Sequence, residues 1–90
     1  MQCTLSILLS LKSGGIGHTV TRMIDLPFTP AYDIALYLPE FEESRLPKRI
    51  EYDIEDECFR VFFDEIKCDA ENERALMMKM YEASGWSANG

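Results

Sequence analysis

The first twelve residues carry the feature that most restricts the fold, an alternation of apolar and polar side chains. The apolar residues stand at odd positions: Cys3, Leu5, Ile7, Leu9 and Leu11. The residues between them are polar, apart from Leu8. Because a period of two places alternate side chains on opposite faces of a β-strand, residues 2–12 are predicted to form a half-buried strand. Glycines within 13–17 supply a turn, and residues 18–28 are predicted to return as an antiparallel partner.

A weaker alternation follows Pro30. Ile34, Leu36 and Leu38 fall on one face of an extended chain, which predicts a short strand near 32–38. The alternative is a helix of one or two turns, because Thr29 suits the N-cap and Pro30 the first helical position. The sequence leaves strand and helix open for residues 30–38.

Residues 49–55 and 58–66 are predicted to form a second hairpin. With Asp56 and Glu57 as the turn, three apolar pairs face each other: Ile54 with Phe59, Tyr52 with Val61, and Ile50 with Phe63. The opposite face of this register joins two charge pairs: Asp53 with Arg60, and Arg49 with Asp64. A turn without Gly or Asn also favours a loop longer than two residues.

The C-terminal third is predicted to hold one helix, near residues 70–84. Asp69 suits the N-cap position, and the first turn is acidic, as the helix dipole favours. An apolar stripe with spacings of three and four follows: Leu76, Met77, Met80, Tyr81 and Ser84. Gly85 and Trp86 fit a Schellman ending in which Trp86 contacts Tyr81. Residues 87–90 are predicted to be a frayed tail.

These elements predict one α+β domain over residues 1–90. A chain of 90 residues has room for one hydrophobic core. The order of the elements predicts a four- to five-stranded antiparallel sheet, built from the two hairpins and covered on one face by the C-terminal helix.

Acidic residues are concentrated in one part of the chain. Sixteen Asp and Glu against nine Lys and Arg give a net charge of -7. Residues 51–73 hold ten acidic and two basic residues, a local charge of -8, whereas the rest holds six acidic and seven basic residues, a charge of +1. Direct DNA or RNA binding is not expected, because phosphate contacts need basic surface. A basic protein partner and simple solubility are the two explanations that remain.

The cysteines and the hydropathy pattern bear on the compartment. Cys3, Cys58 and Cys68 cannot all pair within the chain, and their spacing is not that of a zinc site. No apolar run approaches the roughly 20 residues of a membrane span, and no targeting signal is recognised. We therefore expect a cytoplasmic location, no membrane association, and no metal or cofactor.

Two further patterns suggest chemistry but have plainer explanations. Gly14, Gly15 and Gly17 form a GGxG run, but a phosphate loop precedes a helix, and here a strand is predicted to follow. A hairpin turn explains these glycines. His18 is the only histidine, and no sequence signature joins it to an activated serine or cysteine, so an exposed position at the strand end is expected.

Asp53 together with Glu65, Ile66 and Lys67 is similar to the Asp and Glu-x-Lys arrangement of metal-dependent nucleases. The predicted hairpin register places Asp53 and Glu65 on opposite faces, so no catalytic or metal-binding residues are assigned. A small carboxylate-dependent or metal-dependent hydrolase using Asp53, Asp64 and Glu65 is the least favoured alternative.

The remaining candidates are residues that bind a partner. An acidic row runs along the second hairpin and its turn: Glu51, Asp53, Glu55, Asp56 and Glu57. Tyr37 and Phe62, together with Leu8, are expected on the outer face of the sheet, where three apolar residues would make an interaction patch. We predict a small acidic, non-enzymatic protein-binding module, of the inhibitor or adaptor type, that contacts a basic partner through the hairpin at 51–57. The alternative is a structural subunit that forms a symmetric dimer.

Overall fold

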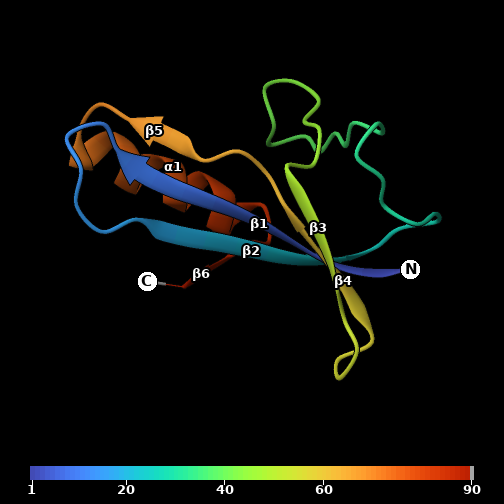
Figure 1. The fold of residues 1–90 in the computed structure, drawn as a ribbon. Coiled ribbons are helices and arrows are strands. Elements are labelled where there is room, and N and C mark those ends of the chain that lie inside the picture. The colour runs from blue at the N-terminus through green and yellow to red at the C-terminus, as the bar shows by residue number, and fades with distance from the viewer. Residues whose placement is uncertain (90) are drawn as a thin grey trace.

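The computed structural model describes residues 1–89 as six strands and one helix (Figure 1). In chain order they are β1 (Gln2–Leu11), β2 (His18–Asp25), β3 (Arg49–Asp53), β4 (Cys58–Phe62), β5 (Ile66–Cys68), α1 (Glu71–Ala83) and β6 (Ser87–Asn89). The strands form one sheet in the order β3-β4-β1-β2-β6, and β5 also pairs with β1. The class is therefore α+β with one C-terminal helix, as the sequence predicts.

Strand β1 lies at the centre of the sheet, and its alternation predicts its burial correctly. Cys3, Leu5, Ile7 and Leu9 have no exposed surface. They contribute to a core that contains Val20, Leu36, Phe41, Val61, Phe63, Tyr81 and Trp86. This core lies on one face of the sheet, under α1 and the connection of residues 26–48. The other face carries the even residues of β1 and has no helix over it in the described chain.

The predicted antiparallel sheet is wrong in one respect, because β1 pairs with β4 and β5 in parallel. The β1–β2, β2–β6 and β3–β4 pairs are antiparallel, so the six-stranded sheet is mixed. The period of two in β1 determines which residues face the core, but it specifies neither the neighbouring strand nor its direction. The parallel pairing joins segments more than 50 residues apart, which no local pattern indicates.

The predicted strand 58–66 is interrupted between β4 and β5. Ser6 pairs with Phe62, an offset of 56 residues, and Leu9 pairs with Ile66, an offset of 57. One extra residue is therefore accommodated on this side, as in a β-bulge. Since a shift of one residue exchanges the two faces of a strand, Ile66 faces the core and Lys67 faces away from it.

The hairpin of β3 and β4 has a register two residues away from the predicted one. Tyr52 pairs with Phe59 and Ile50 with Val61, and residues 54–57 form the turn. The longer loop fits a turn that lacks Gly or Asn, and Glu57 adopts a left-handed conformation with φ of 52°. A shift by two preserves the faces, so the predicted inward side of β4 is correct. The predicted pair of Arg49 and Asp64 is replaced by two others: Arg49 with Glu51, and Lys48 with Asp64.

The strand and the helix considered for residues 30–38 are both wrong. Residues 26–48, all of which the structure describes, form a long irregular connection in which Leu36 and Arg45 make an isolated antiparallel bridge. Leu36 and Phe41 are buried against the core, whereas Ile34 is 40% exposed. The apparent alternation thus comes from a few anchoring residues rather than from a strand.

Helix α1 is confirmed, but its N-cap and its buried face differ from the prediction. The cap residue is Ala70, and no described side chain caps the helix; Asp69 stands one residue before the cap and pairs with Lys12 (2.8 Å). Leu76 and Met80 of the predicted stripe are 66% and 48% exposed. Tyr81 and Arg74 are the buried helix residues, with Met77 and Met78 packed against the core, so the helix is rotated relative to the prediction.

The end of α1 follows the predicted Schellman geometry. Gly85 has a φ of +99°, its N–H donates to Glu82, and the N–H of Trp86 donates to the carbonyl of Tyr81. The Tyr81 and Trp86 rings meet edge to face, with centroids 5.2 Å apart. The predicted frayed tail is wrong, because Ser87–Asn89 pair with β2 as strand β6. Gly90, the last residue of that tail, lies outside the described residues.

Candidate functional site

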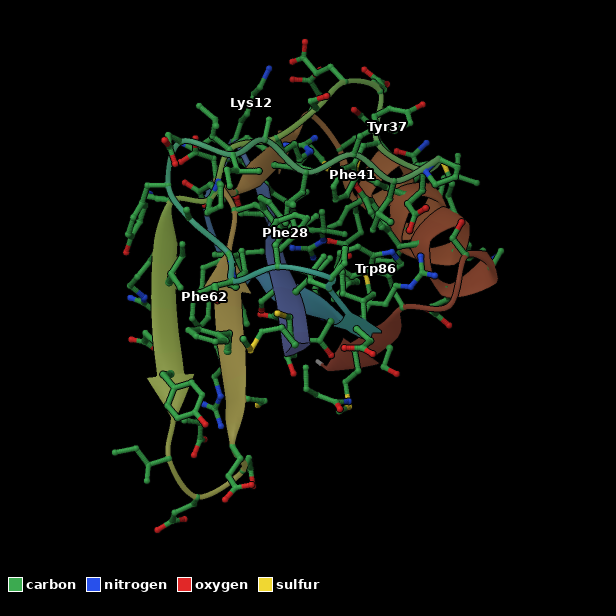
Figure 2. All side chains as sticks on the ribbon, turned by 90° about the vertical axis from the view of Figure 1, so that its right-hand side faces the viewer. Lys12, Phe28, Tyr37, Phe41, Phe62 and Trp86 are labelled. Atoms are coloured by element: carbon green, nitrogen blue, oxygen red, sulfur yellow. The ribbon has the colours of Figure 1, made fainter. Side chains whose placement is uncertain are left out.

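The hairpin of β3 and β4 extends beyond the rest of the sheet. Strand β4 pairs with β1 only over Phe59–Phe62, so the turn at residues 54–57 lies past the N-terminal end of β1. Figure 2 shows the tip of this hairpin standing clear of α1 and of the 26–48 connection. We name residues 51–57 the acidic tip.

Four of the five carboxylates of the acidic tip are exposed: Glu51, Glu55, Asp56 and Glu57. The nearest cations contribute little neutralisation. The Arg49 guanidinium lies 3.4 Å from Glu51, and that of Arg60 lies 3.8 Å from Asp56, both between largely exposed side chains. Exposed pairs of this kind are worth less than about 1 kcal/mol each, so the tip keeps a strongly negative field.

Asp53 has a structural role that differs from that of its neighbours. Its Oδ1 accepts hydrogen bonds from the backbone N–H groups of Glu55 (3.0 Å) and Asp56 (3.1 Å), and its Oδ2 pairs with Arg60. A carboxylate that bonds the backbone two and three residues ahead stabilises a turn. The predicted contact of Asp53 with Arg60 is confirmed, but Asp53 holds the tip in shape rather than offering a free charge.

Two apolar side chains are exposed on the same tip. Ile54 is 81% exposed and Tyr52 is 51% exposed, although the Tyr52 ring meets Phe59 edge to face at 4.9 Å. A shallow hollow of about 480 Å³ runs beside them, lined by Glu51, Tyr52, Asp53, Ile54, Glu55 and Arg60. The tip therefore combines exposed apolar surface with neighbouring carboxylates.

Tyr37 and Phe62 do not form the shared patch that the sequence analysis expects. Phe62 is on the outer face of β4, half-buried under the Arg49 guanidinium, which lies 4.2 Å from the ring centroid. Tyr37 is on the 26–48 connection, at the core side of the sheet, where it lines a hollow with Phe28 and Leu36. Figure 2 places Tyr37 and Phe62 well apart. The expectation failed because residues 32–38 are not a strand.

The arrangement of Asp53, Glu65 and Lys67 differs from the predicted one, and the reason given for separating them is wrong. The extra residue before β5 moves Lys67 to the outer face of the sheet, the face that Asp53 shares, and Glu65 accepts a hydrogen bond there from Ser10 (3.0 Å). Asp53 is instead separated from Glu65 and Lys67 by its position along the strands. Asp53 pairs with Cys58 and so lies level with Gln2 at the start of β1, whereas Ser10 is eight residues further along, about 26 Å at the rise of a strand. Within residues 1–89, no three His, Cys, Asp or Glu side chains gather as a metal site.

The histidine and the cysteines are placed inside the fold. His18 is half-buried rather than exposed, and its Nδ1 has no hydrogen-bond partner among the described residues. All three cysteines are buried free thiols. Burial raises the pKa of the Cys68 thiol, and the neighbouring Glu73 adds to that effect. The pKa of Cys3 is raised for the same primary reason, so both are neutral thiols of low reactivity.

A buried polar cluster was missed by the sequence analysis. Glu40 of the connection, with a side chain 3% exposed, accepts hydrogen bonds from Arg22 of β2 (2.9 Å) and from the indole N–H of Trp86. Burial by itself would raise the pKa of Glu40, but the hydrogen bonds from Trp86, its own backbone and Arg22 outweigh burial and hold that pKa below its usual value. The one signal in the sequence is Arg22, a charge on the apolar face of β2.

The fold and the acidic tip define a small acidic α+β protein with a projecting hairpin. No family model, no curated protein and no solved structure matches the chain. Across residues 1–89, no helix has the length and apolar character needed to cross a membrane.

Proposed function

We propose that this chain is a non-enzymatic binding module that docks on a basic protein through its acidic tip. The observation that carries the proposal is the position of the tip: four exposed carboxylates, with Tyr52 and Ile54 among them, stand on a hairpin that projects from the sheet. Long-range attraction steers a basic partner toward such a tip, and burial of the two apolar side chains then supplies contact energy. Three buried free thiols agree with a reducing compartment, and we place the protein in the cytoplasm.

The test compares two variants with the same change in net charge. One reverses the tip (Glu51→Lys, Glu55→Lys and Glu57→Lys), and the control reverses three exposed acids elsewhere (Glu42→Lys, Glu43→Lys and Glu82→Lys). Circular dichroism verifies that both remain folded. The readout is capture of proteins on the immobilised wild type and each variant, at low and at high salt.

We expect a partner that the wild type and the control retain and that the tip variant loses, with retention falling as salt screens the field over about 8–10 Å. Equal loss in both variants would show that only the net charge matters. A folded tip variant that retains the same partner would refute the proposal.

A symmetric dimer is the second candidate, and one observation favours it. The outer face of the sheet carries exposed Leu8 and Met23 on β1 and β2, and no element of the described chain covers it. Light scattering gives the mass directly. A dimer that Leu8→Lys with Met23→Lys converts to a monomer would support self-assembly, and a wild type that stays monomeric at high concentration would exclude it.

A further inference from the structure

We propose that the partner binds the acidic tip as an added β-strand, with an extended segment of alternating basic and apolar residues pairing along the free edge of β3. This inference rests on the proposed function and specifies the partner's conformation. It is carried by the position of β3 at the end of the sheet, where β4 is its only paired strand in the described chain.

The main-chain groups of β3 are divided between β4 and the free edge. The N–H of Ile50 donates to the hydroxyl of Tyr32 (2.9 Å), so it is directed away from β4. Because main-chain groups alternate in direction along an antiparallel strand, the N–H and C=O of Tyr52 are directed to the same free edge. The hydroxyl of Tyr32 closes this edge at Ile50, and Tyr52 lies past it, on the projecting part of the hairpin. An added strand therefore finds an open donor and acceptor at Tyr52.

The side chains of β3 set the sequence that such a strand needs. Glu51 and Asp53 lie on the outer face, paired with Arg60 and Cys58, and Tyr52 lies on the other face with Phe59. A neighbouring strand would thus place alternate residues beside Glu51 and Asp53, and the residue between them beside Tyr52, while Ile54 and Glu55 follow in the turn. Since opposite charges and apolar groups are the favourable cross-strand pairs, the matching segment alternates Lys or Arg with Val, Ile or an aromatic residue.

The charge of the tip argues against a second copy of this chain as the occupant. Residues 51–57 contain five acidic and no basic residues. Two copies paired through β3 would bring both acidic rows together, and like charges on neighbouring strands are destabilising. A basic segment of another protein has the complementary charge.

The probe is a synthetic peptide that alternates lysine and valine, compared with a peptide of the same composition in which the lysines and the valines are grouped in blocks. Fluorescence anisotropy measures binding to the wild type, to Tyr52→Pro and to Tyr52→Thr. Proline removes the outward N–H of residue 52, and threonine removes the aromatic ring but keeps that N–H. We expect the alternating peptide to bind at least about tenfold more tightly than the blocked one, and Tyr52→Pro to weaken it about tenfold relative to Tyr52→Thr.

Backbone methylation of the peptide tests strand pairing without altering the protein, and so decides the matter even if Tyr52→Pro fails to fold. Only one edge of an added strand faces β3, so N-methylation of one alternate set of residues should abolish binding and methylation of the other should not. If the added strand is antiparallel, the valine opposite Tyr52 forms the hydrogen bonds, so methylation of the valines abolishes binding. If the added strand is parallel, the neighbouring lysines form them, so methylation of the lysines abolishes binding.

The inference is overturned if the alternating and blocked peptides bind equally, or if both methylated sets bind equally. The proposed function would survive either result, since attraction through side chains alone explains it. A wild type that binds these peptides no better than the Glu51→Lys, Glu55→Lys and Glu57→Lys variant would contradict the proposed function as well. Dimerisation that Tyr52→Pro abolishes would identify a second copy as the occupant and refute the inference.

Discussion

The carboxylate of Glu40 accepts the indole N–H of Trp86, and this contact ties the irregular connection to the end of the helix. The same carboxylate meets Arg22 of β2, so one buried acid joins three parts of the chain that are distant in sequence. Phe41, next to Glu40, lies 6.1 Å from the Trp86 ring and 5.6 Å from the Phe63 ring. Glu40 and Phe41 thus help, together with Leu36, to hold a connection without regular secondary structure on the core.

Removing the charge of Glu40 should destabilise the fold. In Glu40→Gln the side chain keeps its size and an acceptor for Trp86, but Arg22 loses its counter-charge. Breaking a partly buried ion pair on one side leaves the other charge uncompensated, and we expect a loss of about 2 kcal/mol, since Arg22 keeps some contact with solvent. Urea unfolding gives the value. The control Glu42→Gln alters an exposed carboxylate and should stay within about 0.5 kcal/mol of the wild type.

The stability of the wild type should depend on pH through Glu40. Its pKa is held below the usual value of about 4.3 in the folded protein, so the unfolded chain binds a proton first as pH falls. The contribution of Glu40 is thus complete above about pH 5 and declines as pH falls through the folded pKa. The difference in unfolding free energy between wild type and Glu40→Gln should shrink across that window. A difference that stays constant from pH 6 to pH 3 would contradict this assignment.

The sequence predicts elements whose signals are local. The alternation in β1, the glycine turn and the Schellman ending at Gly85 each depend on neighbours within a few residues, and each appears in the structure. The parallel pairing of β1 with β4 and the contact of Glu40 with Arg22 join distant segments, and no short window contains both partners. Strand β6 was missed for a related reason, because Ser87–Asn89 lack an apolar pattern and are held by pairing with β2.

The composition of the sequence locates the acidic tip, but it does not predict the conformation of the tip. Counting charges finds the negative segment, and alternation finds the correct faces of β3 and β4. Neither shows that Asp53 is used by the turn, nor that the turn has four residues. The register depends on the loop conformation, and the left-handed Glu57 carries no signal in its residue type.

The orientation of α1 predicts losses of stability of different size for substitutions at two methionines three residues apart. Met77 packs against the core, so Met77→Asp would bury an unpaired carboxylate and should cost at least about 2 kcal/mol. Met80 is 48% exposed, so Met80→Asp should cost less than about 1 kcal/mol, part of it from an acid near the helix C-terminus. Thermal or urea unfolding of the two variants separates them. If Met80→Asp is the more damaging change, the helix presents the other face to the sheet.

Gly85 should be intolerant of a side chain because of its backbone conformation rather than for lack of space. Its φ is +99°, and an added Cβ would lie 3.8 Å from the Nε of Arg22, an ordinary contact. We expect Gly85→Ala to lose about 1 kcal/mol in urea unfolding. Asn tolerates left-handed conformations better than other residues, so Gly85→Asn should lose less. Equal losses would indicate steric conflict instead of backbone strain.

Asp53 should contribute more to the conformation of the acidic tip than to its negative charge. In Asp53→Ala the N–H groups of Glu55 and Asp56 lose their common acceptor and Arg60 loses its partner, whereas Asp53→Asn keeps an acceptor for the two N–H groups and loses only the ion pair. The ion pair is partly exposed, so we expect Asp53→Asn to cost less than about 1 kcal/mol and Asp53→Ala about 1–2 kcal/mol. Amide hydrogen exchange measures this locally: the N–H groups of Glu55 and Asp56 should exchange much faster in Asp53→Ala and nearly as slowly as wild type in Asp53→Asn. Fast exchange in both variants would mean that the ion pair with Arg60, not the turn, holds the tip in shape.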